Sequence, residues 1–287
     1  MRKILLLLIV PLFIASCNKT EDVTIKDNIP PPDGTIDSSI ISIYVNKAYI
    51  NLYGREPQAN EKAAGVAILR QNNFSKSDRE TFINSLLITN EYTYNLYNVA
   101  NNEFLLSLDS TEIEQELALL NYLLTQPQYA PFYDYLRYET YRIDTFKTVL
   151  PGMLAGTVDY RTMLRRMCDN YFYDQINMGT ENFVVSTYQN FLFRYPSDSE
   201  LEAGKQMVDG NTATVFLKLG KSKYDYLNIF FATDDYYEGQ VRFIFKKYLF
   251  REPTAAEIYT YSGIYKSTND FKQLQKAVFT LDEYAGL

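Results

Sequence analysis

Residues 251–257 read Arg-Glu-Pro-Thr-Ala-Ala-Glu, and the pattern Arg-x-Pro-x-x-x-Glu occurs three times in this chain with the same spacing. The other two copies read Arg-Glu-Pro-Gln-Ala-Asn-Glu at residues 55–61 and Arg-Tyr-Pro-Ser-Asp-Ser-Glu at residues 194–200. The repeated positions are Arg55, Pro57 and Glu61, then Arg194, Pro196 and Glu200, then Arg251, Pro253 and Glu257. A motif that recurs with fixed internal spacing predicts a repeated structural module.

The motif has the composition of a junction between two helices. Each copy follows an apolar and aromatic segment, and in the first copy Gly54 stands where a C-cap glycine belongs. The proline suits the start of the next helix, because its missing N–H would be unpaired there in any case. Ser197 with Glu200, and Thr254 with Glu257, match a capping box, whereas the first copy has glutamine in place of the hydroxyl residue. Helix capping therefore explains the repeated glutamate.

The repeated arginine has two interpretations. An arginine at a helix end lies near exposed carbonyl groups and near the capping glutamate of the next helix, which gives it a structural role. Alternatively, the three guanidinium groups could hold a ligand. The structural role is our prediction, and replacing Arg194 with alanine is then expected to lower thermal stability.

A second short signature closes each module. The three closings are Thr89-Asn90-Glu91-Tyr92, Thr233-Asp234-Asp235-Tyr236 and Thr280-Leu281-Asp282-Glu283-Tyr284. The modules therefore lie near residues 40–92, 183–236 and 241–284, and an insert lies near residues 100–175. Within this insert, residues 123–129 look like a closing signature that has no matching Arg-x-Pro opening. Uneven spacing of the copies indicates duplication with divergence rather than a regular solenoid.

The remaining elements are predicted to be helical as well. Helix starts are expected at Ser77 and Thr111, and amphipathic helices over residues 129–146 and 159–167. Pro151-Gly152 is expected in a loop, and residues 212–219 are the one short strand candidate, which a helical turn fits equally well. The predicted fold is all-α: an irregular array of diverged helix-turn-helix modules over residues 38–287.

The N-terminus has the features of a targeting segment. Arg2 and Lys3 precede an apolar run too short to span a bilayer, which predicts a signal peptide at residues 1–16. The small residues before Cys17 resemble the bacterial lipobox, and the resemblance implies lipidation of Cys17. Residues 18–22 resemble the surface-export signals of Bacteroidota lipoproteins. Residues 17–37 are polar and proline-containing, which predicts a disordered tether. We therefore expect an outer-membrane lipoprotein, with surface exposure left open.

Charge and composition exclude several kinds of function. The chain carries a net charge of −7, and loss of Arg2 and Lys3 with the signal peptide would make it −9, which argues against nucleic acid as a partner. The chain has no histidine, so Ser-His-Asp and Cys-His catalysis and imidazole zinc sites are excluded. There is no Gly-rich phosphate loop and no calcium loop, and we expect no cofactor. Cys168 is expected to be a packed small hydrophobic residue.

Carboxylates could still support glycoside hydrolysis, which requires only an acid and a second carboxylate at a defined separation. The candidates are Asp134, Glu139 and Asp144 on one predicted helix, or Asp234 and Asp235. Acids on helix faces are usually solvated. No feature distinguishes one of these carboxylates from the others, so catalysis is an alternative and not the prediction.

Tyrosines cluster in the predicted insert. They are Tyr129, Tyr133, Tyr135, Tyr138 and Tyr141, preceded by Tyr122, and the chain contains 26 tyrosines and no tryptophan. Tyrosine combines an apolar ring with a hydroxyl group, which suits a surface that binds a sugar or a protein. Alternatively, tyrosine replaces tryptophan as a bulky core residue with its hydroxyl near solvent.

Two segments resemble known bacterial families. Residues 123–129 and Tyr135-Leu136-Arg137-Tyr138 resemble a stretch of the DUF1549 family of secreted proteins, and residues 52–61 resemble its Leu-x-Gly-Arg-x-Pro segment. Residues 52–55 also resemble the turn of the DUF4214 helical repeats of extracellular proteins. The chain departs from these patterns, because it lacks tryptophan, histidine and any Cys-x-x-Cys-His haem site. Neither resemblance implies a catalytic residue.

These observations together predict a lipid-anchored envelope protein that acts as a binding or scaffold component without catalysis. Its expected partners are the membrane, through the N-terminal lipid, and an envelope protein or a glycan. Two alternatives stay open: a carboxylate-dependent hydrolase acting on extracellular glycans, and an accessory lipoprotein of glycan uptake in the manner of SusD-type proteins.

Overall fold

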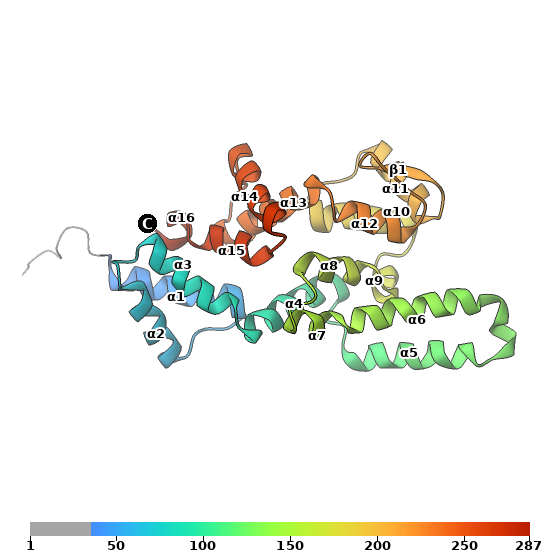
Figure 1. Ribbon diagram of the computed structural model, residues 1–287, viewed down its shortest axis with the longest axis horizontal. Helices are drawn as coiled ribbons and strands as arrows, with labels where there is room; N and C mark the ends of the chain where they lie inside the picture. Colours follow the sequence, from blue (N-terminus) through green and yellow to red (C-terminus); the bar gives the residue numbers. More distant parts are fainter. Residues whose placement is uncertain (1–35) are drawn as a thin grey trace, which may run out of the picture. The chain divides into compact units, whose positions relative to one another are not determined.

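A computed structural model describes residues 36–287, and these residues form an almost entirely helical structure, which confirms the predicted fold class (Figure 1). The predicted signal peptide, Cys17 and the tether up to residue 35 lie outside the described residues. Among the described helices, none combines the length and the hydrophobicity that a membrane span requires.

The described helices fall into four consecutive groups, which we call units: three contain an Arg-x-Pro copy and one corresponds to the predicted insert. The first unit contains the first Arg-x-Pro copy. Its helices are α1 (Ser38–Tyr53), α2 (Ala59–Leu69) and α3 (Lys76–Leu87). Helix α1 ends as predicted at Gly54, whose φ of 72° is left-handed. Helix α3 begins two residues earlier than predicted, because Ser75 and not Ser77 is the N-cap, paired with Asp78 in a capping box.

The second unit corresponds to the predicted insert. Its elements are α4 (Asn90–Leu105), α5 (Ser110–Leu124), η1 (Pro127–Phe132), α6 (Tyr133–Lys147), α7 (Val149–Leu154) and α8 (Tyr160–Cys168), followed by α9 (Tyr171–Ile176).

Several predicted boundaries in the second unit are wrong. Asp109, not Thr111, caps α5. The single helix predicted over residues 129–146 is divided, because Pro131 lies in a 3-10 turn that precedes α6. Pro151 and its neighbouring glycine lie in the short helix α7 rather than in a loop, which is possible because Pro151 occupies the first turn, where no helical N–H is required.

The third and fourth units contain the other two copies. The third consists of α10 (Thr180–Thr187), the π-helical turn η2 (Tyr188–Leu192), α11 (Asp198–Val208), β1 (Ala213–Val215), β2 (Lys218–Gly220) and α12 (Lys223–Phe230). The fourth consists of α13 (Asp234–Leu249), α14 (Ala255–Thr268) and α15 (Phe271–Phe279), and ends in α16 (Asp282–Ala285).

The strand candidate at residues 212–219 forms the antiparallel hairpin of β1 and β2, in which Thr214 pairs with Leu219. Its turn consists of Phe216 and Leu217, which both have positive φ, at 47° and 60°. Two residues of positive φ are characteristic of a type I′ turn. Glycine and asparagine usually occupy such positions, so the sequence carries no hairpin signal there.

Each of the four units closes with a buried tyrosine, and in the first three units this tyrosine comes three residues after a helix N-cap. Thr89, Asn170 and Thr233 each accept a hydrogen bond from the backbone N–H three residues later, at 3.2, 3.0 and 3.1 Å. The tyrosines at the closings are Tyr92, Tyr173, Tyr236 and Tyr284, and all are at most 1% exposed. The second unit is therefore closed at Asn170 to Tyr173, and the closing predicted at Tyr129 is wrong.

The fourth unit packs against the first (Figure 1). The Tyr44 hydroxyl donates to the Phe279 carbonyl at 2.9 Å, and Asn51 donates to the Tyr284 hydroxyl at 2.8 Å. Arg79, nearly fully buried, forms an ion pair with Asp282. These contacts join helices that are separated by almost the whole described sequence.

Candidate functional site

Each Arg-x-Pro copy forms an ion pair with two carboxylates, which we call the clamp. In the first unit, Nη1 and Nη2 of Arg55 lie 2.7 and 2.8 Å from the two carboxylate oxygens of Glu61. Nε and Nη2 of the same arginine lie 2.5 and 2.9 Å from the oxygens of Glu91. The capping glutamate and the acid of the closing signature are therefore joined by one guanidinium group.

The other two copies repeat this arrangement. Arg194 contacts Glu200 at 2.8 and 2.7 Å and Asp235 at 2.8 Å. Arg251 contacts Glu257 at 2.9 and 2.6 Å and Glu283 at 2.7 Å through both Nε and Nη2. The pairing with Glu91, Asp235 and Glu283 was not predicted, although the recurrence of an acid in each closing signature was a usable signal.

Each clamp arginine is also held by its own unit. Its Nη1 donates to the carbonyl of the following residue, at 3.0 Å from Glu56, 3.2 Å from Tyr195 and 3.1 Å from Glu252. Its guanidinium lies over an aromatic ring six positions earlier in the sequence, which is Tyr49, Tyr188 or Phe245. Because Arg55 and Arg251 use Nε and both Nη atoms within the chain, they have little capacity to hold a ligand.

The clamps perturb the titration of the capping glutamates. Hydrogen bonds from the arginine side chains lower the pKa values of Glu61, Glu200 and Glu257 to about 2. The same bonds raise the pKa values of the three arginines. All six groups therefore stay charged over the physiological pH range, which fits a structural ion pair and not a general acid or base.

The predicted tyrosine surface lies on the hairpin formed by α5, η1 and α6. Tyr129, Tyr135, Tyr138 and Tyr141 are 38, 58, 41 and 66% exposed. Tyr133 is half-buried, and its hydroxyl donates to the Gln126 carbonyl at 3.1 Å. The alternative that these tyrosines fill the core is wrong for the four exposed rings. The closing tyrosines do fill the core, but the hydroxyl groups of Tyr92 and Tyr236 are buried rather than near solvent.

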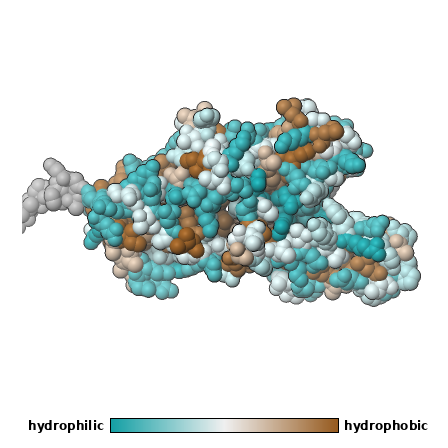
Figure 2. Space-filling model, in the orientation of Figure 1, coloured by the Kyte–Doolittle hydropathy of each residue, from teal (hydrophilic) through white to brown (hydrophobic). Residues whose placement is uncertain are grey.

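Further exposed rings extend this surface. Tyr122 and Phe132 are 59 and 57% exposed, and with Tyr129, Tyr135, Tyr138 and Tyr141 they make up what we call the aromatic tip. Residues 117–133 contain no charged side chain, and pale and brown atoms appear among teal ones over this hairpin, at lower right in Figure 2. No two rings of the aromatic tip contact each other, and the ring of Tyr138 is covered on one side by the Arg142 guanidinium.

The candidate carboxylates are not brought together as a catalytic pair. Glu139 is buried and receives two hydrogen bonds from Arg142, at 2.8 and 2.9 Å, while Asp134 is fully exposed beside Arg137. Asp144 is exposed. Asp235 belongs to a clamp, and Asp234 pairs with Lys266. Burial is the main influence on Glu139 and raises its pKa.

A buried ionic cluster connects the second and third units. Arg142, which is 4% exposed, contacts Glu139, Asp169 and Asp174, and Lys223 contacts Asp174. Cys168 is buried beside this cluster, as predicted for a packed cysteine, and burial raises the pKa of its thiol. Sequence reasoning identified only Glu139 here: Arg142 is three residues away, but Asp169, Asp174 and Lys223, which show that the pair belongs to a buried cluster, are distant in the sequence.

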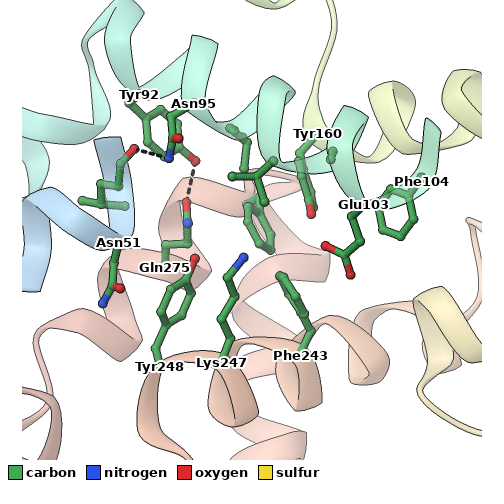
Figure 3. Close-up of a pocket in the computed structure, with 15 residues that line it drawn as sticks. Asn51, Tyr92, Asn95, Glu103, Phe104, Tyr160, Phe243, Lys247, Tyr248 and Gln275 are labelled. Atoms are coloured by element: carbon green, nitrogen blue, oxygen red, sulfur yellow. Dashed lines mark hydrogen bonds between the residues drawn. The ribbon is translucent and has the colours of Figure 1, made fainter. Parts of the chain in front are cut away.

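A narrow pocket lies where α4, α8, α13 and α15 meet (Figure 3). Its cavity volume is about 30 Å³, which is room for about two waters. Glu103 and Lys247 lie on opposite walls, and burial raises the pKa of Glu103 and lowers that of Lys247. The pocket is too small for a sugar or a nucleotide.

Comparisons with known proteins give no assignment. No protein-family model matches the chain, and neither a curated protein nor a solved structure does. The resemblance to the DUF1549 and DUF4214 families therefore stays a prediction. Within residues 36–287, no group of three or more acidic or cysteine side chains is placed to hold a metal ion.

Proposed function

We propose that this chain is a lipid-anchored outer-membrane protein whose helical array displays the aromatic tip to an envelope protein partner, without catalysing a reaction. The observation that carries this proposal is the exposure of six aromatic rings on a hairpin with a long uncharged stretch. Exposed aromatic residues that gather in one region mark interaction surfaces, because their burial on binding contributes much of the free energy of association.

The contacts of the hairpin support the same interpretation. None of the residues of η1 is buried, and η1 packs chiefly on α5 and α6. The end of the hairpin therefore contributes little to the core of the array. Tyrosine and phenylalanine in such a position are costly to leave in water, and a partner would bury them.

The proposed anchor rests on the N-terminal sequence. Lipidation at Cys17 would fix the chain to a membrane, and the polar residues before Ser38 would separate the array from the bilayer surface. Replacing Cys17 with alanine is expected to move the protein from the membrane fraction to the soluble fraction after cell disruption.

Site-specific crosslinking tests the partner surface. A photoreactive amino acid placed at Gln128, between the exposed rings, is expected to give one discrete crosslinked product in intact cells. The double variant Tyr122→Ala/Phe132→Ala should abolish that product while leaving the far-UV circular dichroism spectrum unchanged. The matched control is Tyr259→Ala, which removes a ring that is 85% exposed on α14 and should leave the product intact. If Tyr259→Ala reduced the crosslinked product as much as Tyr122→Ala/Phe132→Ala does, the proposal would be contradicted.

A glycan is the second candidate occupant of the aromatic tip. Gln126 and Gln128 place amide groups among the exposed rings, and a sugar ring stacks on tyrosine while its hydroxyl groups bond to amides. The glycan is tested by retention of the protein on immobilised envelope polysaccharide. Retention that is lost in Tyr122→Ala/Phe132→Ala, together with no protein crosslink at position 128, would identify a glycan and not a protein as the occupant. The hydrolase alternative is not proposed, because no two candidate carboxylates are brought together.

A further inference from the structure

A pocket of about 150 Å³ lies between helices α8 and α12. It is lined by Arg161, Thr162 and Arg165 from α8, by Asn228 from α12, and by Phe231 and Ala232, which directly follow α12. Its polar lining consists of two guanidinium groups, one hydroxyl and one amide, so every polar side chain can donate a hydrogen bond. No carboxylate lines it, although the chain has 35 acidic and 28 basic residues.

The two arginines are four positions apart and therefore lie on the same face of α8. Like charges in this arrangement repel each other. Arg161 has one hydrogen bond within the described residues, from Nη1 to the Tyr237 hydroxyl at 2.9 Å, and no ion pair there. A half-buried guanidinium without a carboxylate partner is unusual, because its charge is partly desolvated without compensation.

Arg165 forms an ion pair with Asp169, but its hydrogen bonding is incomplete. Its Nη1 is buried and has no hydrogen-bond partner among the described residues, and an oxygen of Asp169 lies 3.6 Å away, beyond hydrogen-bond distance. The other oxygen of Asp169 lies 3.2 Å from Nε of Arg142. The guanidinium of Arg165 lies over the ring of Tyr224, at 5.5 Å from its centroid, which helps to orient it.

The nearby acid at the start of α8 does not neutralise the pocket. Asp159 caps the helix by accepting from the Thr162 N–H at 2.6 Å, and its second oxygen accepts from Asn269, also at 2.6 Å. The hydroxyl of Thr162 and the amide of Asn228 have no hydrogen-bond partner within residues 36–287. Four side chains that line this pocket therefore have hydrogen-bond donors that no group within residues 36–287 uses.

We propose that this pocket binds a tetrahedral oxyanion, namely a phosphate or sulfate group, either as the free ion or as an ester on a larger molecule. An anion supplies the negative charge that Arg161 lacks, adds to the pairing of Arg165 with Asp169 and relieves the repulsion between the two guanidinium groups. The arginine forks bond to its oxygens, and the hydroxyl and amide complete the set of donors. The volume has room for several water molecules and hence for a group of this size. This site is separate from the aromatic tip, and either proposal can fail without the other.

Isothermal titration calorimetry on the full chain, purified in detergent, tests the site. Sodium phosphate and sodium sulfate, titrated at constant ionic strength against a chloride background, are expected to show saturable binding of one ion per chain. Arg161→Gln and Arg165→Gln should each weaken this binding about tenfold or more, which is the loss expected from one charge-assisted hydrogen-bonding group. Glycerol phosphate distinguishes the sources: tighter binding than phosphate indicates an ester, and weaker binding indicates the free ion.

Two further variants protect the test against misfolding and against unspecific charge effects. Arg166→Gln makes the same charge change on the same helix, but Arg166 bonds to Thr148 and does not line the pocket, so affinity should be unchanged. Thr162→Val keeps the charge and should still weaken binding severalfold. The proposal is overturned if wild type shows no saturable binding, if Arg166→Gln weakens binding as much as Arg165→Gln, or if acetate binds as tightly as phosphate.

Discussion

The second unit and the three clamped units are built from the same order of parts but differ at one junction. In the clamped units, a left-handed residue (Gly54, Phe193 or Phe250) is followed by Arg-x-Pro and then by the N-cap of the next helix. In the second unit, Leu106 and Ser107 are both left-handed, and the N-cap Asp109 comes three residues after Leu106 instead of four, with neither arginine nor proline between them. A capping box is nevertheless present at Asp109 and Glu112.

The two kinds of unit also use their aromatic residues differently. The two helices after the junction have 15 residues each in the second unit, against 11 and 12, 11 and 8, and 14 and 9 in the clamped units. The added length extends beyond the array and carries the aromatic tip. The clamped units also have exposed tyrosines, such as Tyr195 and Tyr259, but only the second unit carries several exposed aromatic rings on one helical hairpin.

The largest expected effect comes from removing a closing tyrosine. Tyr236 is fully buried, and its hydroxyl pairs with that of Tyr265. Tyr236→Ala should therefore lower the free energy of unfolding by about 3–5 kcal/mol, as for other large buried rings. Tyr141→Ala, in the aromatic tip, should change it by less than about 0.5 kcal/mol. Urea denaturation measures both, and equal losses would remove the distinction between the two kinds of unit.

The next effect tests how closely a clamped unit packs against the helix that follows it. A Cβ added at Gly239 of α13 would lie 2.1 Å from the carbonyl oxygen of Phe191 in η2. Gly239→Ala should therefore cost about 1–3 kcal/mol, since backbone must move to admit the methyl group. Gly263→Ala is the matched control, because open space surrounds that glycine, and it should instead stabilise by about 0.5–1 kcal/mol.

Breaking a clamp directly should have a smaller effect. Arg194→Ala is expected to lower the free energy of unfolding by about 1–2 kcal/mol, because the pairs with Glu200 and Asp235 are well oriented but about a third exposed and hence screened. Arg137→Ala, which removes the exposed pair with Asp134 in the second unit, should change little. An unchanged melting temperature in Arg194→Ala would remove the structural interpretation of the motif.

The same clamp should appear in the pH dependence. Glu200 has a folded pKa of about 2, against about 4.3 for an unperturbed glutamate. As the pH falls, the unfolded chain binds this proton first, so the stability that the clamp contributes is complete above about pH 5 and is lost on going toward pH 2. The difference in free energy of unfolding between wild type and Arg194→Ala should therefore shrink over this range. A constant difference would mean that the arginine stabilises the fold by packing alone.

The smallest effect compares the clamped units with one another. Phe250 is 83% exposed and has a φ of 57° where the first unit has Gly54. Phe250→Gly should stabilise the chain by about 0.5–1 kcal/mol, because glycine adopts this conformation without strain. Gly54→Ala should do the opposite, since its Cβ would also lie 2.7 Å from the Asn95 side chain. A loss of stability in Phe250→Gly would show that the exposed ring makes a contact worth more than the strain.

Predictions from sequence succeeded where the interaction is local. Ser197 bonds to Glu200, and Thr254 to Glu257, within one helical turn, so their residue types and spacing were sufficient to predict the capping boxes. The hairpin turn at Phe216 and Leu217 was not predictable, because its residues contradict the local preference. Its conformation is fixed instead by packing of Phe216 on Tyr188 and Phe230.

For the candidate sites, the residue types could be read directly from the chain: no histidine, three copies of Arg-x-Pro-x-x-x-Glu and a cluster of tyrosines. The packing of the helices was needed to show that the clamp has a second carboxylate, that the tip tyrosines are exposed, and that Arg161 and Arg165 line a pocket that has no acid in its lining. Helix caps depend on neighbours in the sequence, whereas burial and charge pairing depend on helices that meet only after the units have packed together.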